Sequence, residues 1–565
     1  MRVVTRHRFA AATAAVAAIA IAFILAGCVQ GPLDPARAEA ELDRLVQKIQ
    51  PKEARLDASA LAEAVPAQSV ADTLPDIRKY PIVVDSLAAG AVSAEIFSST
   101  EKSGSGTDGC LVEIARDFND RGFRIAGGGV AQVRIRSIPS GTAYEYIAYG
   151  KYLPDGFTPS NHLWIQMVKA AGVPVTAIAE RLVGNTAGIV MKEEVYAGLQ
   201  KKYGAVEVPG IINAVAEGSL AMGYTNPFAS STGLNFLVTV LETFAKGDQK
   251  KLLSPEVVSA FEAFQKGVPF VSLTTMQMRD SVQRGGSLDA FIMEYQTFVN
   301  TEVLKRGYRF IPFGYAHENP LYAIGTPDAQ RRAVLSLFAD FVRSPSSQAI
   351  AKRYGFEKDL SWQPLTALPP GDLLVKAQKL WKEKKDLGRP VVAVFLSDVS
   401  GSMDGARIKA LKEALTRGSA FVDPRNSIGL ASFSSDVTKI LPVRQFTEEQ
   451  KALFLSAVKG MSAGGNTAMY DGIMVALQML VEQRRQVPDA KLLLFVLTDG
   501  ETNRGLVFDR VSQVIAALGV PVYTIAYGEN VSELSRLSSL NEAANLKADP
   551  LDIAYQIGAL LNAEM

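Results

Sequence analysis

The sequence predicts two α/β domains in series, and three observations lead to this prediction. The chain has 565 residues, too many for one ordinary hydrophobic core, and its 48% hydrophobic and 21% charged composition is typical of globular protein. Short apolar runs alternate with helical patterns from about Tyr80 to the C-terminal end. A stretch rich in proline, glycine and lysine at residues 361–390 interrupts this alternation, and we place the domain boundary there.

The first 28 residues have the pattern of an export signal. Three arginines precede an apolar stretch from Phe9 to Leu25, and the tetrad "LAGC" follows. The tetrad resembles the lipobox of bacterial lipoproteins, which implies that residues 1–27 are removed and that Cys28 carries a membrane-anchoring lipid. An uncleaved transmembrane helix is the alternative, because the apolar stretch is just long enough to span a bilayer. Both interpretations place the bulk of the chain outside the cytoplasm.

The net charge and the cysteine content of the chain argue against several functions and against a disulfide. The formal net charge is +1, and it becomes −2 once the three arginines of the signal are removed, which argues against a nucleic-acid partner. The only other cysteine is Cys110, so no intrachain disulfide is available once Cys28 is lipidated. At the start of a predicted helix, Cys110 is expected to be a small buried hydrophobe rather than a nucleophile.

Residues 28–360 divide into a tether and a first domain. Residues 28–78 are rich in alanine, proline and charge, with one amphipathic helix predicted around Ala38 to Ile49, and we expect them to space the body from the membrane. In residues 79–360, strand-like runs such as "AQVRIRSIPSG" alternate with helical patterns such as "PEVVSAFEAFQKG". This alternation predicts an α/β domain.

The second domain follows a linker at residues 361–389 and spans residues 390–565. Its apolar runs, such as "PVVAVFLSD", "SIGLASFSS", "KLLLFVLTDG" and "PVYTIAYG", are separated by helical patterns, and a closing helix is predicted near "PLDIAYQIGALLN". Strands that are apolar along their whole length are buried on both faces. We therefore predict a doubly wound, largely parallel sheet.

Oxygen-bearing side chains gather after two of these strands. Asp398, Ser400 and Ser402 end the first strand, Asp499 ends a later one, and Thr467 lies on a glycine-rich loop. Ligands of such sheets bind at the carboxyl ends of the strands, and two carboxylates meeting there would repel each other unless a cation lay between them. Replacing Asp398 by alanine would relieve this repulsion, so we expect the fold to survive it. Oxygen donors favour Mg²⁺ or Mn²⁺ before Ca²⁺, and argue against zinc.

The order D-x-S-x-S, a later threonine and a later D-G resembles the metal-ion-dependent adhesion site of von Willebrand factor type A (VWA) domains. The resemblance implies that Ser400 and Ser402 are direct ligands, that Thr467 engages when a partner is bound, and that the two aspartates hold the ion directly or through water. It also implies that an acidic side chain of a partner protein completes the coordination. The alternative is that "DVSGS" is merely a turn whose side chains cap the next helix.

In the first domain, two hydroxyl-rich loops follow predicted strands, "IFSSTEKSG" and "TNPFASSTG". The backbone N–H groups at a helix start, flanked by small hydroxyls, suit a carboxylate or oxyanion. With "DAQRRAVLSLFADFVRSPSSQAIAKRYGF", these segments resemble type 2 periplasmic solute-binding proteins, whose two α/β lobes close on a small molecule. The resemblance implies ligand contacts from Ser98, Ser99, Thr225, Asn226, Ser230, Ser231, Thr232 and Tyr295. These loops could also be turns and helix caps alone.

An enzymatic function is not expected. Ser99 and Lys102 form S-x-x-K, the spacing of penicillin-binding proteins and serine β-lactamases, but S-D-N and K-T-G are absent from the sequence. His162 is expected to be structural. The sequence therefore predicts a lipid-anchored, extracytoplasmic binding protein with an adhesion or scaffolding role. The alternative is a solute receptor of an ABC-type transport system, with the second domain as a docking module.

Overall fold

The computed structural model describes residues 33–54, 74–85, 88–268, 270–272, 274–283, 288–385, 389–500, 502–527, 532–541, 543, 545–548, 557 and 560–561. The predicted export signal and Cys28 lie outside the described residues, and so does the predicted closing helix apart from Ile557, Leu560 and Leu561, which are buried. Within the described residues, no helix has both the length and the apolar character that a membrane span requires.

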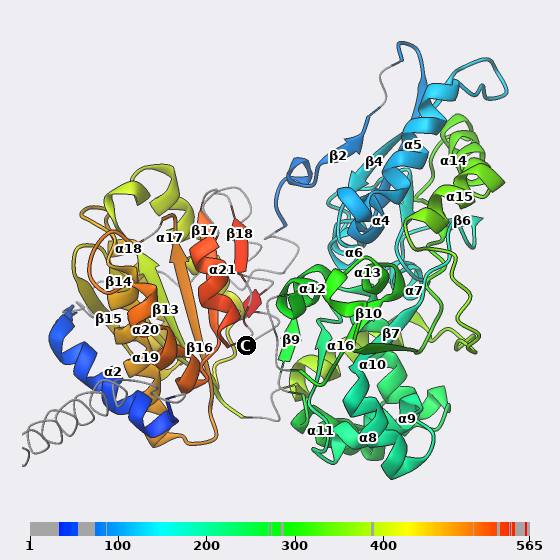
Figure 1. The fold of residues 1–565 in the computed structure, drawn as a ribbon. Helices are drawn as coiled ribbons and strands as arrows, with labels where there is room; N and C mark the ends of the chain where they lie inside the picture. Colours follow the sequence, from blue (N-terminus) through cyan, green and yellow to red (C-terminus); the bar gives the residue numbers. More distant parts are fainter. Residues whose placement is uncertain are drawn as a thin grey trace, which may run out of the picture.

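The first domain consists of two lobes, each built on its own sheet (Figure 1). The sheet of lobe 1 has the order β2 (Ile82–Val84), β4 (Ala131–Ser137), β3 (Val92–Ser98), β5 (Gly156–Thr158), β12 (Leu321–Ile324), β6 (Val175–Ala179). The sheet of lobe 2 has the order β11 (Tyr308–Pro312), β7 (Ala187–Lys192), β10 (Ala290–Glu294), β8 (Met222–Thr225), β9 (Phe270–Ser272). The chain crosses from lobe 1 to lobe 2 after β6 and returns after β11, and residues 354–370 later lead from lobe 1 to a helix that contacts both lobes.

Helices cover both sheets. In lobe 1 they are α4 (Thr100–Ser103), α5 (Cys110–Arg121), α6 (Ser140–Ala148), α7 (Leu163–Ala170), α14 (Ala329–Val342) and α15 (Pro345–Arg353). In lobe 2 they are α8 (Glu193–Tyr203), α9 (Val208–Ala216), α10 (Ser231–Phe244), α11 (Pro255–Lys266), α12 (Thr275–Gln283) and α13 (Tyr295–Val299). Helix α14 shows how the sequence sets a helix start: the Asp328 carboxylate accepts a hydrogen bond from the Arg331 backbone N–H at 2.9 Å. Cys110 is buried, and burial raises the pKa of its thiol to about 12, as expected of an inert core residue.

The predicted linker contains a helix that packs between the two lobes. Helix α16 (Gly371–Lys384) places Leu374 in a core shared with Leu163 of lobe 1, and Ala377 and Trp381 in the core of lobe 2. The Trp381 indole N–H donates to the Tyr224 hydroxyl at 2.5 Å. The structure therefore differs from the predicted boundary, because residues 371–384 belong to the first domain. The proline and glycine residues before this helix predict the end of a domain. The apolar face of the helix, however, determines which surface it packs against.

The second domain is a seven-stranded sheet between two layers of helices. Its order is β1 (Lys52–Glu53), β15 (Val437–Gln445), β14 (Ser427–Phe433), β13 (Val391–Asp398), β16 (Lys491–Thr498), β17 (Val522–Tyr527), β18 (Asn545–Ala548). Neighbouring strands are parallel except for the antiparallel pair β14 and β15. Residues of β13 alternate between the two cores, as predicted: Val392 and Val394 face one, Val391 and Ala393 the other. The predicted fold class of both domains is confirmed.

Helices α19 (Met469–Gln486), α20 (Phe508–Leu518) and α21 (Ser532–Ser539) cover one face of this sheet. Helices α17 (Ala406–Gly418) and α18 (Glu448–Gly460) cover the other. The metal-type motif thus lies at the carboxyl ends of the central strands, where the polar loops leave the apolar core.

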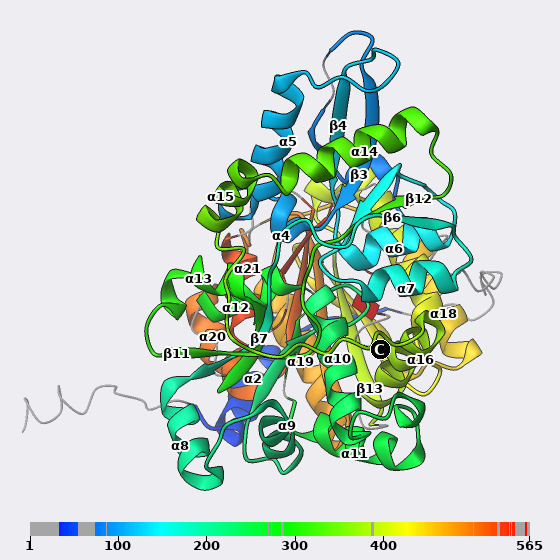
Figure 2. The same cartoon turned by 90° about the vertical axis from the view of Figure 1, so that its right-hand side faces the viewer.

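The N-terminal helix α2 (Pro35–Ile49), from the predicted tether, packs on the second domain (Figures 1 and 2). Its apolar stripe, Ala38, Leu42, Leu45 and Val46, is buried in the core that α19 and α20 share. Full burial of one leucine side chain contributes about 2 kcal/mol. Residues predicted to act only as a spacer therefore form part of the domain.

The direction of α2 follows from its ion pairs. Glu39 pairs with Arg484 at 2.6 Å, near the C-terminal end of α19, and further along α2 the Asp43 carboxylate accepts from Gln478 at 3.0 Å. Strand β1 follows, and Lys52 pairs with Asp436 at 2.6 Å, beside the start of β15. Helix α2 therefore runs antiparallel to α19, toward the end of the sheet that carries Asp398.

Candidate metal site and interlobe cluster

Asp398 is the last residue of β13 and is completely buried. One of its carboxylate oxygens accepts from the Ser400 backbone N–H at 2.8 Å, and the other from the Thr498 hydroxyl at 2.5 Å. Burial raises the pKa of Asp398, and the neighbouring Asp499 carboxylate adds to the rise. The structure thus places the two aspartates near one another, as expected from the strand ends.

Ser400, Ser402 and Asp499 form a continuous series of hydrogen bonds. The two serine hydroxyl oxygens lie 3.1 Å apart, and the Ser402 hydroxyl donates to Asp499 Oδ1 at 2.8 Å. Ser400 is buried, whereas Ser402 is exposed. Four of the five predicted ligands therefore lie at one edge of the sheet, with the outermost hydroxyl open to solvent.

The loop that carries Thr467 is bonded to the loop after β13. The Gly401 N–H donates to the Gly465 carbonyl oxygen at 3.0 Å, and the Gly464 N–H donates to the Val399 carbonyl oxygen at 2.8 Å. Gly465 has φ of +89°, and a Cβ there would lie 2.8 Å from the Ser435 hydroxyl, so only glycine suits the position. These contacts bring the buried Thr467 to the same end of the sheet.

The donor chemistry of this edge fits a hard divalent ion. Its predicted ligands are hydroxyl and carboxylate oxygens, which Mg²⁺ and Mn²⁺ prefer. Among the residues that the structure describes, no three histidine, cysteine or acidic residues gather in a manner that could hold a metal, so a zinc-type cluster is not found there. A cation between Asp398 and Asp499 would relieve the repulsion that helps to raise the pKa of Asp398.

Two further residues contact this site and were not predicted from the sequence. The Thr498 hydroxyl donates to Asp398, and an Arg407 guanidinium N–H donates to Asp499 Oδ2 at 2.5 Å and to the Ser402 carbonyl oxygen at 3.1 Å. Thr498 immediately precedes Asp499, so its position could have indicated a role. Arg407 lies in the first turn of α17, and the sequence carries no signal that its side chain turns back toward the strand ends.

In lobe 1 of the first domain, the predicted ligand residues Ser98 and Ser99 are buried, and the Ser99 hydroxyl is already hydrogen-bonded. The Lys102 ammonium donates to the Ser99 hydroxyl and to the Thr158 carbonyl oxygen, each at 2.7 Å, and the Ser160 hydroxyl donates to Ser99 at 3.3 Å. The Ser98 hydroxyl has no hydrogen-bond partner in the part of the chain that the structure describes. The S-x-x-K pair is therefore in contact, but Lys102 links two strand ends rather than standing free.

In lobe 2 the predicted residues act mainly in local structure. The Ser230 hydroxyl accepts from the Gly233 backbone N–H at 3.3 Å as the N-cap of α10, and it also accepts from the Thr225 hydroxyl at 2.9 Å. The Asn226 side chain accepts from the Phe228 backbone N–H at 2.8 Å. Tyr295 is half-buried and its ring packs against other aromatic rings. The cap and turn interpretation therefore accounts for several of these residues.

Contacts between the lobes meet around Ser231. The Ser231 hydroxyl accepts from the Trp164 indole N–H of lobe 1 at 2.9 Å, and its carbonyl oxygen accepts from the Asn161 side chain at 3.1 Å. Arg279 of α12 pairs with Asp108 of lobe 1 at 3.1 Å. The hydroxyl loop at residues 230–232 thus does lie against lobe 1, through residues that the sequence did not single out.

His317, on the segment that returns to lobe 1, is the centre of a buried polar group that we name the interlobe cluster: His317, Glu294, Asn161, Asn235, Asn185 and Thr232. The His317 Nδ1 lies 2.9 Å from Glu294 Oε1, and its Nε2 lies 3.2 Å from the side-chain nitrogens of both Asn161 and Asn235. Because amide nitrogens only donate, this geometry fits the tautomer with hydrogen on Nδ1. Asn185 and Thr232 also donate to Glu294, at 2.8 and 3.3 Å.

Two ionisable residues beside this cluster have pKa values far from their ordinary values. Burial, and then the charge of Glu294, raises the pKa of the buried Glu101 carboxyl. Burial lowers the pKa of Lys102, and the nearby Glu101 and Glu294 charges oppose the change. Buried ionisable groups of this kind are frequent at ligand sites, although ion-pair networks produce them too.

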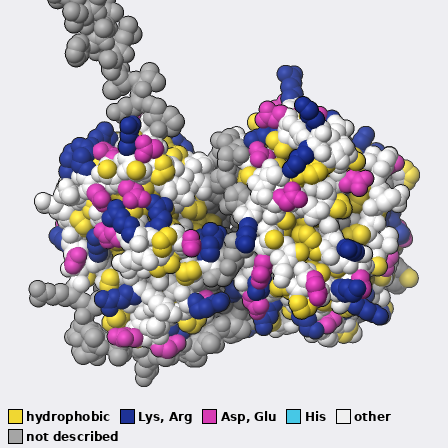
Figure 3. Space-filling view, turned by 90° about the horizontal axis from the view of Figure 1, so that it is seen from below, with side chains coloured by type: hydrophobic (Ala, Val, Ile, Leu, Met, Phe, Trp, Pro, Cys, Tyr) yellow, Lys and Arg dark blue, Asp and Glu magenta, His cyan; other side chains and the backbone are white. Residues whose placement is uncertain are grey.

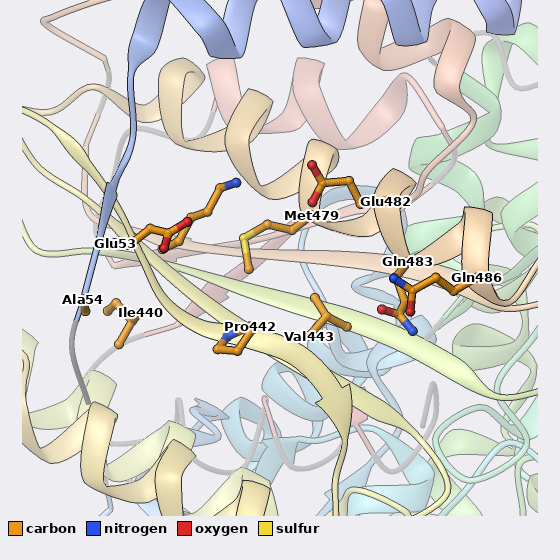
Figure 4. A pocket seen from close by; sticks show the side chains of 10 residues that line it. Glu53, Ala54, Ile440, Pro442, Val443, Met479, Glu482, Gln483 and Gln486 are labelled. Atoms are coloured by element: carbon orange, nitrogen blue, oxygen red, sulfur yellow. The ribbon is translucent and has the colours of Figure 1, made fainter. Parts of the chain in front are cut away.

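The surface of the second domain also carries hollows, and Figure 4 shows one of them. This pocket of about 430 Å³ lies between β1, β15 and α19, and its lining includes the apolar side chains of Met479, Ile440 and Val443 and the acidic side chains of Glu53 and Glu482. It contains none of the predicted site residues. Elsewhere, the face in Figure 3 mixes lysine, arginine and acidic side chains over both domains.

Comparisons with known proteins match both halves of the chain. Residues 393–549 match the von Willebrand factor type A domain, and residues 103–357 match the bacterial extracellular solute-binding protein family. Inter-alpha-trypsin inhibitor heavy chain H4 of Bos taurus is 35% identical over 121 residues, which cover 20% of this chain and 13% of that protein. The human H4 chain is 29% identical over 152 residues, 25% of this chain and 16% of that protein. The chain thus spans a small part of the length of these relatives.

Solved structures similar to each half also exist. A von Willebrand factor type A structure from Catenulispora acidiphila covers 31% of this chain and 42% of its own, with 20% identity and a TM-score of 0.29. The sulfate-binding protein SubI from Mycobacterium tuberculosis covers 51% of this chain and 91% of its own, with 16% identity and a TM-score of 0.34. The family matches themselves identify both parts as binding or interaction modules. This chain contains a domain of the bacterial extracellular solute-binding protein family followed by a VWA domain.

Proposed function

We propose that the protein is a lipid-anchored, extracytoplasmic binding protein with an adhesion or scaffolding role. Its VWA domain holds Mg²⁺ or Mn²⁺ with Asp398, Ser400, Ser402, Thr467 and Asp499, and an acidic side chain of a partner protein completes the coordination. The first domain binds a small ligand. The observation that carries the proposal is the hydrogen-bonded series from Asp398 to Asp499, in which two carboxylates and two hydroxyls share one edge of the sheet.

The charge balance explains why such a site would bind an acidic partner. Two aspartates nearly neutralise a divalent ion, and the serine and threonine hydroxyls add no charge. Ser402, the outermost hydroxyl, is exposed, so one side of the ion would face solvent. An ion held in this way retains affinity for one more anionic oxygen, which a partner carboxylate supplies.

Calorimetric titration of Mn²⁺ into the full chain tests the metal site. We expect saturable binding to one site, and at least a hundredfold weaker binding to Asp398→Asn. The matched control is Asp423→Asn, because Asp423 is an aspartate of the same domain whose partner is the exposed Arg425. Equal Mn²⁺ affinity in the wild type and Asp398→Asn would place any metal binding elsewhere and would refute the proposal.

A transport function is the second candidate, and the two-lobed first domain favours it, since residues 103–357 match a solute-binding family. In this case the protein delivers a solute to a membrane permease, and the VWA domain docks the complex. Deletion of the gene should then abolish import of one solute, whereas an adhesion or scaffolding protein should leave solute uptake unchanged.

A further inference from the structure

Arg407 contacts the candidate metal site from outside its predicted ligands. Its guanidinium donates to Asp499 Oδ2 at 2.5 Å and to the Ser402 carbonyl oxygen at 3.1 Å. The Asp499 side chain has no exposed surface, whereas 45% of the Arg407 side chain is exposed. A buried carboxylate is therefore neutralised by a cation that reaches it from the solvent side.

Both oxygens of Asp499 have a partner in this arrangement. Oδ1 accepts from the Ser402 hydroxyl at 2.8 Å, and Oδ2 accepts from Arg407. A guanidinium has no lone pair and cannot be a metal ligand, and its positive charge repels a divalent ion. Any ion that takes Asp499 as a direct or water-bridged ligand must therefore compete with Arg407 for the same carboxylate.

The exposed position of Arg407 allows it to leave. It is the second residue of α17, and the glycine that precedes this helix, Gly405, has open space around it. Movement of the guanidinium into solvent would cost its hydrogen bonds to Asp499 and to the Ser402 carbonyl oxygen. Exposed arginines exchange such bonds for water at small cost.

We propose that Arg407 is a resident counter-ion of the metal site. It neutralises Asp499 in the metal-free protein, and a divalent ion must displace it, so that the protein binds metal more weakly than its oxygen ligands alone would. This inference rests on the proposed metal site and adds a residue that sets its affinity. The site therefore fills only where the concentration of the ion is high enough to displace the arginine.

Calorimetric titration of Mn²⁺ into the wild-type full chain and into Arg407→Ala tests the inference. We expect Arg407→Ala to bind Mn²⁺ about three- to fivefold more tightly, because ion pairs with an exposed partner contribute up to about 1 kcal/mol and 1.4 kcal/mol corresponds to tenfold. Arg407→Lys keeps the charge and should stay within about twofold of the wild type. The matched control is Arg425→Ala, which removes an exposed arginine paired with Asp423 at 2.7 Å in the same domain, and should leave Mn²⁺ affinity unchanged.

The possible outcomes separate this inference from the proposed function. If the wild type binds Mn²⁺ and Arg407→Ala binds it equally or more weakly, Arg407 is no competitor and the inference fails, while the metal site stands. If Arg425→Ala tightens binding as much as Arg407→Ala, the effect is one of net charge and the inference also fails. If neither the wild type nor Arg407→Ala binds Mn²⁺, the metal site and its counter-ion are refuted together.

Discussion

The polar groups of the two domains are arranged in different ways. In the interlobe cluster, His317, Glu294 and three asparagines satisfy one another inside the protein, and the lobes are already in contact. In the VWA domain the series of oxygens from Asp398 to Asp499 reaches the surface at the exposed Ser402, with the half-exposed Arg407 beside it. Groups that satisfy one another hold a structure together, whereas a series that reaches the surface can accept a further ligand.

The largest effect is expected from breaking the interlobe cluster. Replacing His317 by alanine leaves Glu294, Asn161 and Asn235 without their ring partner, and an unsatisfied buried group costs about 1–3 kcal/mol. We expect a loss of about 3 kcal/mol or more in the free energy of unfolding, measured by urea denaturation. The control His162→Ala, whose ring is partly exposed, should lose clearly less. Equal losses would mean that the cluster does not stabilise the domain.

At the metal site, the two substitutions of Asp398 should differ in stability. Asp398→Ala leaves the Ser400 N–H without its acceptor, and leaves the Thr498 hydroxyl only its longer contact with the Gly500 carbonyl oxygen at 3.3 Å, at a cost of about 2 kcal/mol. Asp398→Asn can still accept from the Ser400 N–H and donate to the Thr498 hydroxyl. This differs from the expectation from sequence that alanine would merely relieve repulsion. Thermal unfolding in EDTA measures the difference, and an alanine variant as stable as the asparagine variant would contradict it.

The sequence predicts some residues of the two sites and misses others. Asp398, Ser400 and Ser402 could be predicted because their spacing is short and because strand ends collect loops at one edge. Arg407 could not, because its contact depends on the rotamer of one long side chain. In the first domain, His317 meets Asn161 from a separation of 156 residues, which no local pattern encodes. A hydroxyl-rich loop such as the one that contains Ser230 is as typical of a helix cap as of a ligand contact.

The fold, too, could be predicted from the sequence where it depends on local patterns, but not where it depends on contacts between distant segments. Apolar periodicity located the strands and helices of both domains, because burial on one or two faces dictates it. It could not assign α2 and α16 to a domain, because an amphipathic helix near a break in the chain fits whichever apolar surface lies nearby. Only the tertiary structure places Leu42 on the second domain and Trp381 on lobe 2.

A smaller, pH-dependent effect is expected from Glu101. Burial raises its pKa from 4.5 to about 7, so on acidification from about pH 8 to about pH 5.5 the folded protein takes up a proton that the unfolded chain does not, and the fold gains stability. Glu101→Gln should therefore be more stable than the wild type at about pH 8, by about 1 kcal/mol, and close to it at about pH 5.5. Because the charge of Glu101 also acts on the pKa of Lys102, the difference between the two proteins includes the loss of this attraction. Melting temperatures that differ equally at both pH values would exclude a buried, titrating Glu101.

The smallest effect concerns a single contact between the lobes. Trp164→Phe removes the indole N–H that donates to Ser231 and keeps most of the apolar ring, so we expect a loss of about 0.5–1 kcal/mol in unfolding free energy. A neighbouring aromatic control is Tyr144→Phe, which changes a ring that packs on Trp164. If Trp164→Phe costs no more than this control, the bond between the lobes contributes nothing measurable.

The packing of α2 on the VWA domain determines how mechanical force would pass through the protein. The helix starts at the end of the sheet opposite Asp398 and runs toward it, so a lipid at Cys28 would hold the domain from the side away from the metal loops. A partner pulling on those loops would load the VWA domain lengthwise, and the force would reach the membrane through the buried stripe around Leu42 without passing through the first domain. If α2 were peeled away, the two-lobed domain would enter the line of tension, because it lies between α2 and β13 in the chain.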